Sequence, residues 1–269
     1  DQGRAEGAVM FFRLCRIEVR KTLRRRDLYV SLGLLVLFVA SFFYAFSSQN
    51  WDKWFRRKGA LYSMVKYTVE RVEHRAFHIS EFANGIFFAG MTIGFSFHLL
   101  FPIFASLIGG IQVAGEAKDG TLRATLIRPV SRTQLLLAKF GVAILYLFVV
   151  MWFFLGLALL LGIPTFGWNR VLAFNNIFMQ VGPGKGAFFV MAPGEALQRL
   201  AIVCALGCYS MLVVASLSLF LSTLFDGPIV PIVGSVGVYF ISFILGQESE
   251  GFFEHLRKYL FTSHMFFWR

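Results

Sequence analysis

The sequence predicts an all-α polytopic membrane protein, and two observations carry that prediction. Apolar residues make up 57% of the 269 residues, with 33 Phe, which leaves too few charged residues for the surface of an ordinary soluble domain. The charged residues also cluster between long apolar runs, as expected when a charge at the bilayer centre costs roughly 2.5 to 3.5 kcal/mol. Residues 1–269 are therefore predicted to form a single transmembrane domain, in which an amphipathic helix precedes five visible transmembrane helices.

The net charge of +11 indicates attraction to anionic lipid headgroups and a role in topology, rather than binding of nucleic acid, in a chain of this composition. The three cysteines do not make a disulfide framework. The predicted spans carry no paired carboxylates or His clusters, so we expect neither catalytic residues nor a metal site. Partners of the nucleic-acid class are not expected.

Residues 9–27 are predicted to form a basic amphipathic helix, with Leu14 and Ile17 on its apolar face. Basic residues crowd its other face: Arg13, Arg16, Arg20, Lys21 and Arg24 to Arg26. A helix of this kind lies in the headgroup layer of an anionic leaflet.

The first two predicted spans are residues 28–47 and 84–110, each long enough to cross a bilayer. The external loop between them, residues 48–83, interleaves aromatic and basic residues and is expected to lie against the outer interface. Within the second span Gly90 and Gly94 have the small-xxx-small spacing that lets a neighbouring helix approach closely.

Three further spans follow. The third, residues 135–163, is closed by a proline and leads into a Gly- and Pro-rich external loop, residues 164–196. The fourth and fifth spans, residues 197–225 and 229–246, are separated by a tight turn and form a hairpin. Residues 247–269 make an external amphipathic tail.

The polar interlude at residues 115–134 has the order of a structured loop. Asp119, Gly120 and Thr121 predict a turn and a cap for a short helix that begins at the next residue. Pro129 ends that helix. Ser131 and Gln134 then form a capping box ahead of the third span.

This interlude resembles the cytoplasmic loop of ABC-2 type transporter permeases. The residues that carry the resemblance are Glu116, Gly120-Thr121-Leu122, Pro129, Ser131-Arg132 and Lys139. In that family the loop carries a coupling helix that docks on the ATPase subunit. The resemblance implies coupling roles for Glu116, Gly120, Thr121, Arg123, Arg128, Pro129, Ser131 and Arg132. We also expect Glu116 to pair with Arg128 or Arg132, because an acid near the end of a descending helix is otherwise opposed by its dipole.

The resemblance also implies further features of the protein. The helix at residues 9–27 corresponds to the family's elbow helix, which touches the ATPase. Residues 182–186 lack the spacing of a phosphate loop, so this chain is not expected to be an enzyme, and ATP and Mg are expected on a partner ATPase subunit. A second permease copy or homologue and membrane lipids are the other expected partners. Because the family usually has six spans, we expect a sixth to follow residue 269.

The concentration of basic residues before the first span places the amino terminus in the cytoplasm, and a bacterial inner membrane is the expected location. The predicted function is the permease subunit of an ATP-binding cassette exporter that moves a hydrophobic or amphiphilic substrate by alternating access. An alternative is a non-transporting membrane scaffold or sensor that recruits partners through its elbow helix and aromatic external loop. A membrane-embedded enzyme is a weaker third alternative.

Overall fold

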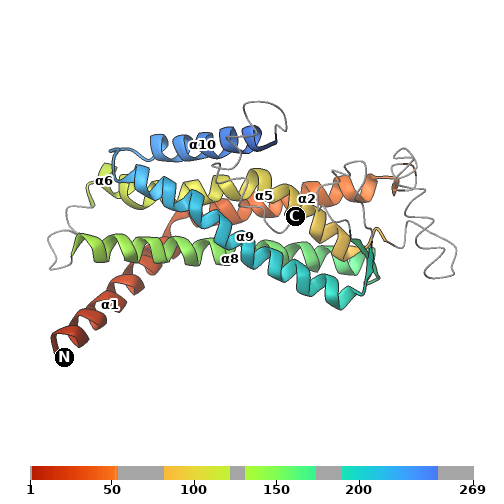
Figure 1. Cartoon of the computed structure of the whole chain (residues 1–269), viewed down its shortest axis with the longest axis horizontal. Helices are drawn as coiled ribbons and strands as arrows, with labels where there is room; N and C mark the ends of the chain where they lie inside the picture. Colours follow the sequence, from red (N-terminus) through yellow and green to blue (C-terminus); the bar gives the residue numbers. More distant parts are fainter. Residues whose placement is uncertain (1, 52, 54–81, 122–130, 174–188, 248–269) are drawn as a thin grey trace. The chain divides into compact units, whose positions relative to one another are not determined.

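The computed structural model describes residues 2–51, 53, 82–121, 131–173 and 189–247 (Figure 1). Its helices are α1 (Gln2–Arg24), α2 (Arg26–Ser48), α5 (Gly85–Gly110), the π-helix η2 (Ile111–Gly115), α6 (Glu116–Lys118), α8 (Arg132–Phe166), α9 (Pro193–Ser222) and α10 (Ile229–Gln247). Two short strands, β1 (Val171–Ala173) and β2 (Phe189–Met191), pair antiparallel.

In the described part of the chain, four helical segments are long and apolar enough to cross a membrane. They are Arg26–Ser48, Gly85–Lys118, Arg132–Phe166 and Pro193–Ser222, and a shorter apolar helix covers Ile229–Leu245. At 35 residues α8 is about 52 Å long, which exceeds a hydrocarbon core of about 30 Å, so it must tilt or extend beyond the core.

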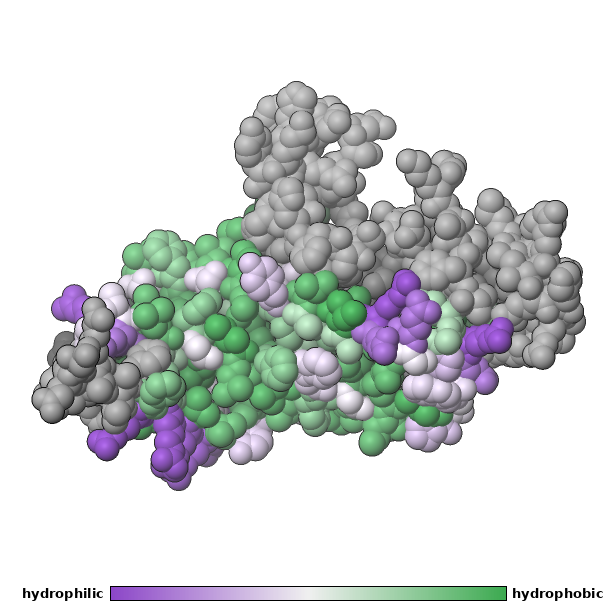
Figure 2. Space-filling view, turned by 60° about the horizontal axis from the view of Figure 1, so that its bottom comes forward, coloured by the Kyte–Doolittle hydropathy of each residue, from purple (hydrophilic) through white to green (hydrophobic). Residues whose placement is uncertain are grey.

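Apolar side chains dominate the coloured surface of the face in Figure 2. Large hydrophobic residues are exposed along these helices, for example Leu37 in α2, Leu160 in α8 and Ile241 in α10. Such a surface is stable against lipid and would be costly in water. The prediction of an all-α polytopic membrane protein is confirmed.

The helix boundaries differ from the sequence-based ones, and α9, for example, covers Pro193–Ser222 where residues 197–225 were predicted. The amphipathic helix α1 runs from Gln2 to Arg24 and stops at a bend at Arg25, so α2 starts before residue 28. Pro164 lies inside the last turn of α8 instead of closing it, and α8 ends at Phe166. The segment predicted as external loop 164–196 contains the β1–β2 pair, in which Val171 faces Met191.

The chain divides into two compact units. Unit 1 contains α1, the start of α2, the second half of α5 with η2 and α6, the first part of α8, α9 from Ala205 onward, and α10. Unit 2 contains the rest of α2, the first half of α5, the end of α8, both strands and the start of α9.

In unit 1 the second half of α5 packs tightly against α9. A Cβ at Gly109 would lie 2.8 Å from Ser218 Cβ and 2.9 Å from the Leu219 backbone nitrogen, so glycine lets the two backbones approach. The buried Ser218 hydroxyl donates a hydrogen bond to the Ser106 carbonyl at 2.6 Å. This contact places the end of α9 beside η2.

In unit 2 the start of α5 is held by Asn84, which is 1% exposed. Its Oδ1 accepts hydrogen bonds from the Ile86 and Phe87 amides, both at 3.1 Å, which caps the helix. Its Nδ2 donates to the Asn169 carbonyl at 3.1 Å and the Arg170 carbonyl at 2.7 Å. The side chain therefore joins α5 to the segment between α8 and β1.

Candidate functional site

One face of α1 packs on the beginning of α8, and Figure 1 shows the two helices crossing there. Leu14 of α1 forms a buried cluster with Leu135 and Ala138 of α8. Glu18 and Lys21 follow Leu14 at helical spacing, so they point toward the same partner helix. Beside this cluster Glu18 is 2% exposed, whereas the Lys21 side chain stays 39% exposed.

The start of α8 is fixed by the predicted capping box. The Ser131 hydroxyl accepts a hydrogen bond from the Gln134 amide at 3.2 Å, and the Gln134 side chain accepts one from the Ser131 amide at 3.3 Å. The capping box is therefore present as the sequence predicts. Two turns into the helix, Lys139 shares the face of Leu135 and is 1% exposed.

Four charged side chains from three segments form a closed ring, which we call the charge ring: Glu18, Lys21, Glu116 and Lys139. Lys21 Nζ lies 3.1 Å from Glu18 Oε1 and 3.4 Å from Glu116 Oε1. Lys139 Nζ lies 3.2 Å from Glu18 Oε2 and 2.9 Å from Glu116 Oε2. Each carboxylate thus contacts both ammonium groups, and each ammonium group contacts both carboxylates.

The charge ring has no formal net charge, and three of its side chains, all except Lys21, are at least 94% buried. Lys139 Nζ also donates a 2.8 Å hydrogen bond to the Gln112 carbonyl, so its three N–H groups have three oxygen neighbours. A buried charge is tolerated when it is paired and hydrogen-bonded, and removal of one partner leaves the others uncompensated. The positions of α1, α6 and α8 are therefore energetically linked.

The π-helix η2 links α5 to Glu116, and its carbonyl groups bind side chains from other elements. The Gly110 carbonyl accepts a hydrogen bond from Ser222 Oγ at 2.8 Å. The next two carbonyls, of Ile111 and Gln112, accept from Arg25 Nη1 at 3.4 Å and from Lys139 Nζ at 2.8 Å. Three consecutive carbonyls are thus bound by the end of α9, the α1–α2 bend and α8.

Glu116, placed by the sequence in the coupling loop, has different ionic partners from those expected. It pairs with Lys21 and Lys139, where we expected Arg132 or Arg128. Arg132 is exposed at the first position of α8, and Arg128 lies outside the described residues. The carboxylate of Glu116 thus faces α1 and α8, and a contact with Arg128 stays a prediction.

The structure describes the surroundings of some of the other predicted coupling residues, and the coupling roles of all of them stay predictions. Gly120 has φ +71°, a left-handed conformation that favours glycine, and the Thr121 hydroxyl donates to the Glu116 carbonyl at 3.3 Å. Arg123, Arg128 and Pro129 lie outside the described residues, as does the predicted short helix between Gly120 and Ser131. Their roles stay predictions.

The elbow helix presents its basic residues as the sequence suggests, since Arg13, Arg16 and Arg20 are all exposed. Its apolar face is arranged differently. Ile17 is 38% exposed and Leu23 52% exposed, while the buried face carries Glu18. The exposed combination of apolar and basic side chains is that of a helix at a lipid headgroup layer.

Among the described residues the contact at Gly90 is an ordinary one, and the packing role of this glycine stays a prediction. A Cβ there would lie 4.0 Å from Leu200 Cδ1, an ordinary contact. Close backbone approach is found at Gly109, described above, and at Gly85, where a Cβ would lie 2.5 Å from the Gly162 backbone. The packing role of Gly94 stays a prediction.

The sequence pattern did not predict Glu18 and Ser222 as site residues, and Lys139 was named only as part of the family resemblance, without a role in the site. Glu18 is an acid among the basic residues of an amphipathic helix, three residues before Lys21, and Lys139 lies inside an otherwise apolar run. Both are signals, because a charge in such surroundings requires a partner. Ser222 carried no comparable signal, since serines are frequent in the fourth span.

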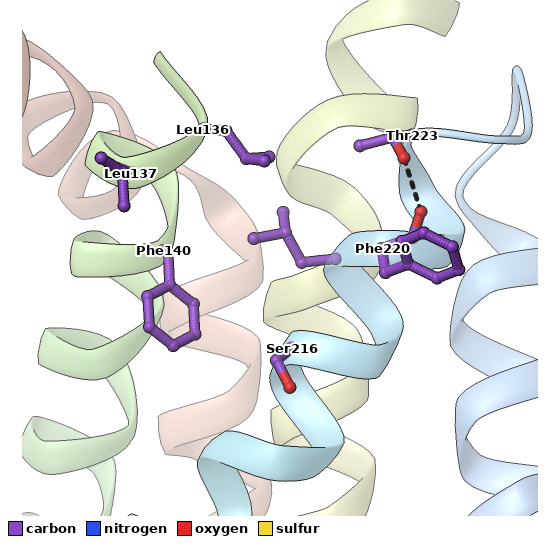
Figure 3. Close-up of a pocket in the computed structure, with 7 residues that line it drawn as sticks. Leu136, Leu137, Phe140, Ser216, Phe220 and Thr223 are labelled. Atoms are coloured by element: carbon purple, nitrogen blue, oxygen red, sulfur yellow. Dashed lines mark hydrogen bonds between the residues drawn. The ribbon is translucent and has the colours of Figure 1, made fainter. Parts of the chain in front are cut away.

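An apolar groove lies between α8 and α9 in unit 1 (Figure 3). Its volume is about 250 Å³, and it is lined by Leu136, Leu137, Phe140, Ser216, Leu219, Phe220 and Thr223. The Thr223 hydroxyl donates to the Phe220 carbonyl at 2.7 Å, and the Ser216 hydroxyl donates to the Val213 carbonyl at 2.8 Å. With its hydroxyl groups engaged in their own helix, the groove offers an apolar surface.

These features define an integral membrane protein whose charged site joins the helices around a polar loop. The comparison with known families agrees. The description "ABC-2 family transporter protein" matches residues 13–257, and the chain therefore belongs to this family of ABC transporter permeases. Such permeases are membrane subunits that work with a separate ABC ATPase subunit. Searches among curated proteins and among solved structures gave no significant match.

Proposed function

We propose that this chain is the permease subunit of an ATP-binding cassette exporter and that the charge ring transmits the movement of the ATPase subunit to the spans. The single observation that carries the proposal is the closed ring itself. The ring joins α1, which is the predicted elbow helix, to Glu116 at the start of the polar loop and to α8, which follows the loop. A force on that loop therefore acts on α1 and α8 together.

The mechanism would be alternating access. ATP, held with Mg on the partner subunits, closes the ATPase pair, and the loop between Lys118 and Ser131 is pushed toward the membrane. Because Lys139 is buried in α8 and bound to both carboxylates, α8 follows α1 instead of moving separately. The spans of this copy and of a second permease copy then shift between inward and outward states.

The test uses the permease co-purified with its ATPase subunit in lipid nanodiscs. We define the ATP response as the change in hydrogen exchange of α8 between the nucleotide-free and the vanadate-trapped complex. Glu116→Gln and Arg132→Gln should keep the complex assembled and ATP hydrolysis active while reducing the ATP response. The matched control is Arg199→Gln, in an exposed pair with Glu195 at 2.9 Å. An unchanged ATP response in both test variants would refute the coupling role.

The substrate class proposed is hydrophobic or amphiphilic, and the groove of Figure 3 supports it because its exposed lining is apolar. Phe140→Trp, which fills the groove, should reduce stimulation of ATP hydrolysis by a fluorescent phosphatidylethanolamine. Leu145→Trp is the control, because Leu145 is also exposed on α8 but does not line the groove. Equal stimulation in the two variants argues against the groove as a substrate site.

The proposed orientation has a cytoplasmic amino terminus in a bacterial inner membrane. It predicts that a cysteine at Asp119 is labelled only after the membrane is opened, whereas one at Asn50 is labelled from outside intact cells. Both side chains are exposed, so access depends on the side of the membrane. The reverse pattern would invert the topology and with it the assignment of the polar loop to the ATPase side.

The scaffold or sensor alternative is separated by the same preparation. A scaffold recruits partners without nucleotide-driven movement, so it should show no ATP response even in the unchanged protein. It also has no requirement for a stoichiometric ATPase subunit. Recovery of a complex with equal numbers of permease and ATPase chains favours the transporter.

A further inference from the structure

Ser222, the last residue of α9, occupies an unusual position at η2. In an α-helix the Ala114 amide would donate to the Gly110 carbonyl, four residues earlier. Here the Ala114 amide instead donates to Ser222 Oγ at 2.7 Å, and that hydroxyl donates to the Gly110 carbonyl at 2.8 Å. The serine hydroxyl is therefore inserted into one helical hydrogen bond, which is a recognised cause of a local irregularity in a helix.

The hydroxyl is held in this position by its surroundings. It also accepts a hydrogen bond from the Val113 amide at 3.2 Å, which uses its remaining acceptor capacity, and Ser222 is 1% exposed. One turn earlier, Ser218 binds the Ser106 carbonyl and fixes α9 along α5. The position of the inserted hydroxyl thus depends on the position of α9.

We propose that Ser222 is a positioning residue that holds η2 in its π geometry and thereby places Glu116 in the charge ring. This inference rests on the proposed coupling function of that ring. Without the hydroxyl, the Ala114 amide bonds directly to the Gly110 carbonyl and η2 closes into a regular α-helix. Closure rotates every following residue about the helix axis, so Glu116 turns away from Lys139.

A second observation gives η2 a reason to rearrange. The Gln112 side-chain Nε2 is buried and has no hydrogen-bond partner among the described residues. A buried amide donor without a partner is unfavourable, and rotation of η2 would change its surroundings. A displacement of α9 would then move Ser222, and through η2 it would change the contacts of Glu116 with Lys21 of α1 and Lys139 of α8.

The experiment compares Ser222→Ala with Ser218→Ala in the complex with the ATPase subunit. Both variants remove a buried hydroxyl from the same face of α9, but only Ser222 bonds to η2 amides. Cryo-electron microscopy of each complex in nanodiscs reads the geometry of residues 111–115, and the ATP response of α8 reads coupling. Ser222→Thr retains the hydroxyl and serves as the rescue variant.

We expect Ser222→Ala to convert η2 to α-helix, to break the Glu116–Lys139 contact and to lower the ATP response about fivefold, the lower end of typical coupling between sites. Ser218→Ala and Ser222→Thr should keep the π geometry of η2, the Glu116–Lys139 contact and the ATP response. The inference is overturned if η2 stays π-helical in Ser222→Ala, if the Glu116–Lys139 contact persists in that variant, or if Ser218→Ala also converts η2 to α-helix. An unchanged response in Glu116→Gln instead overturns the ring's coupling function, whereas the hold of Ser222 on η2 is judged by the geometry of residues 111–115 and by the Glu116–Lys139 contact.

Discussion

The two compact units fasten α5 in different ways at its two ends. Its first residues are held in unit 2 by the Asn84 amide, by close backbone contact between Gly85 and Gly162, and by packed aromatic rings. Phe88 of α5, for example, lies 5.2 Å from Phe46 and 5.7 Å from Phe166 between ring centroids. Its last residues also pack closely on α9 at Gly109, but in unit 1 they lead to η2 and the charge ring, where the contacts are ionic or made by single hydroxyl groups.

The contacts at the two ends of α5 differ in how readily they can rearrange. In unit 2 all four hydrogen-bonding positions of the Asn84 amide are used, and the glycine contact leaves no space for sliding. In unit 1 each lysine contacts two carboxylates, so one contact can lengthen while the other remains. A protein driven by a partner needs one region that responds and one that stays fixed, and these two fastenings suit those roles.

The largest expected effect is that of Lys139→Met. It leaves Glu18 and Glu116 with Lys21 as their shared cation, and loss of one partner from a buried ion pair costs about 3 to 5 kcal/mol. We expect a marked fall in resistance to unfolding by detergent, measured by loss of the monodisperse peak. The control, Arg199→Met, breaks an exposed pair and should cost at most about 1 kcal/mol. Equal stability of the two variants would show that the ring is not a buried network.

The next prediction tests the fixed region. Asn84→Ala removes the cap of α5 and two bonds to the Asn169 and Arg170 carbonyls, so it should cost about 2 kcal/mol. Because this region is proposed to stay fixed, the ATP response of the surviving complex should be unchanged. Asn84→Asp keeps the cap but not the donors, so an intermediate loss is expected. A reduced ATP response in these variants would end the distinction between the two regions.

Glycine substitutions give the third prediction. Gly85→Ala places a Cβ 2.5 Å from the Gly162 backbone and should cost about 1 to 3 kcal/mol, since backbone cannot give way easily. Gly90→Ala meets only the Leu200 side chain at 4.0 Å, and better helix propensity should make it neutral or stabilising by up to about 1 kcal/mol. Both are read as thermal stability in the same detergent. The reverse order would restore Gly90 as the packing glycine.

The sequence predicted the helical architecture well because apolar run length is a local property that the bilayer imposes on each span. It also predicted the Ser131–Gln134 box, whose two bonds join residues three apart. It did not predict the ring, because the choice between Lys139, Arg128 and Arg132 as partners of Glu116 depends on how α1 crosses α8. The insertion of Ser222 into η2, more than 100 residues earlier in the chain, has likewise no local signature.

The smallest effect is expected for Ser131→Ala, which removes the hydroxyl that caps the Gln134 amide. The site is exposed, so the cost should be about 1 kcal/mol, typical of a lost cap, and fraying should stop before the buried contacts of Leu135 and Lys139. Hydrogen exchange should therefore rise in the first turn of α8 and remain slow from Ala138 onward. Ser131→Asp, which retains a capping oxygen, is the control and should show no rise. If exchange instead rises through Lys139 in Ser131→Ala, the cap and the ring unfold as one unit, and the charge ring is weaker than its burial implies.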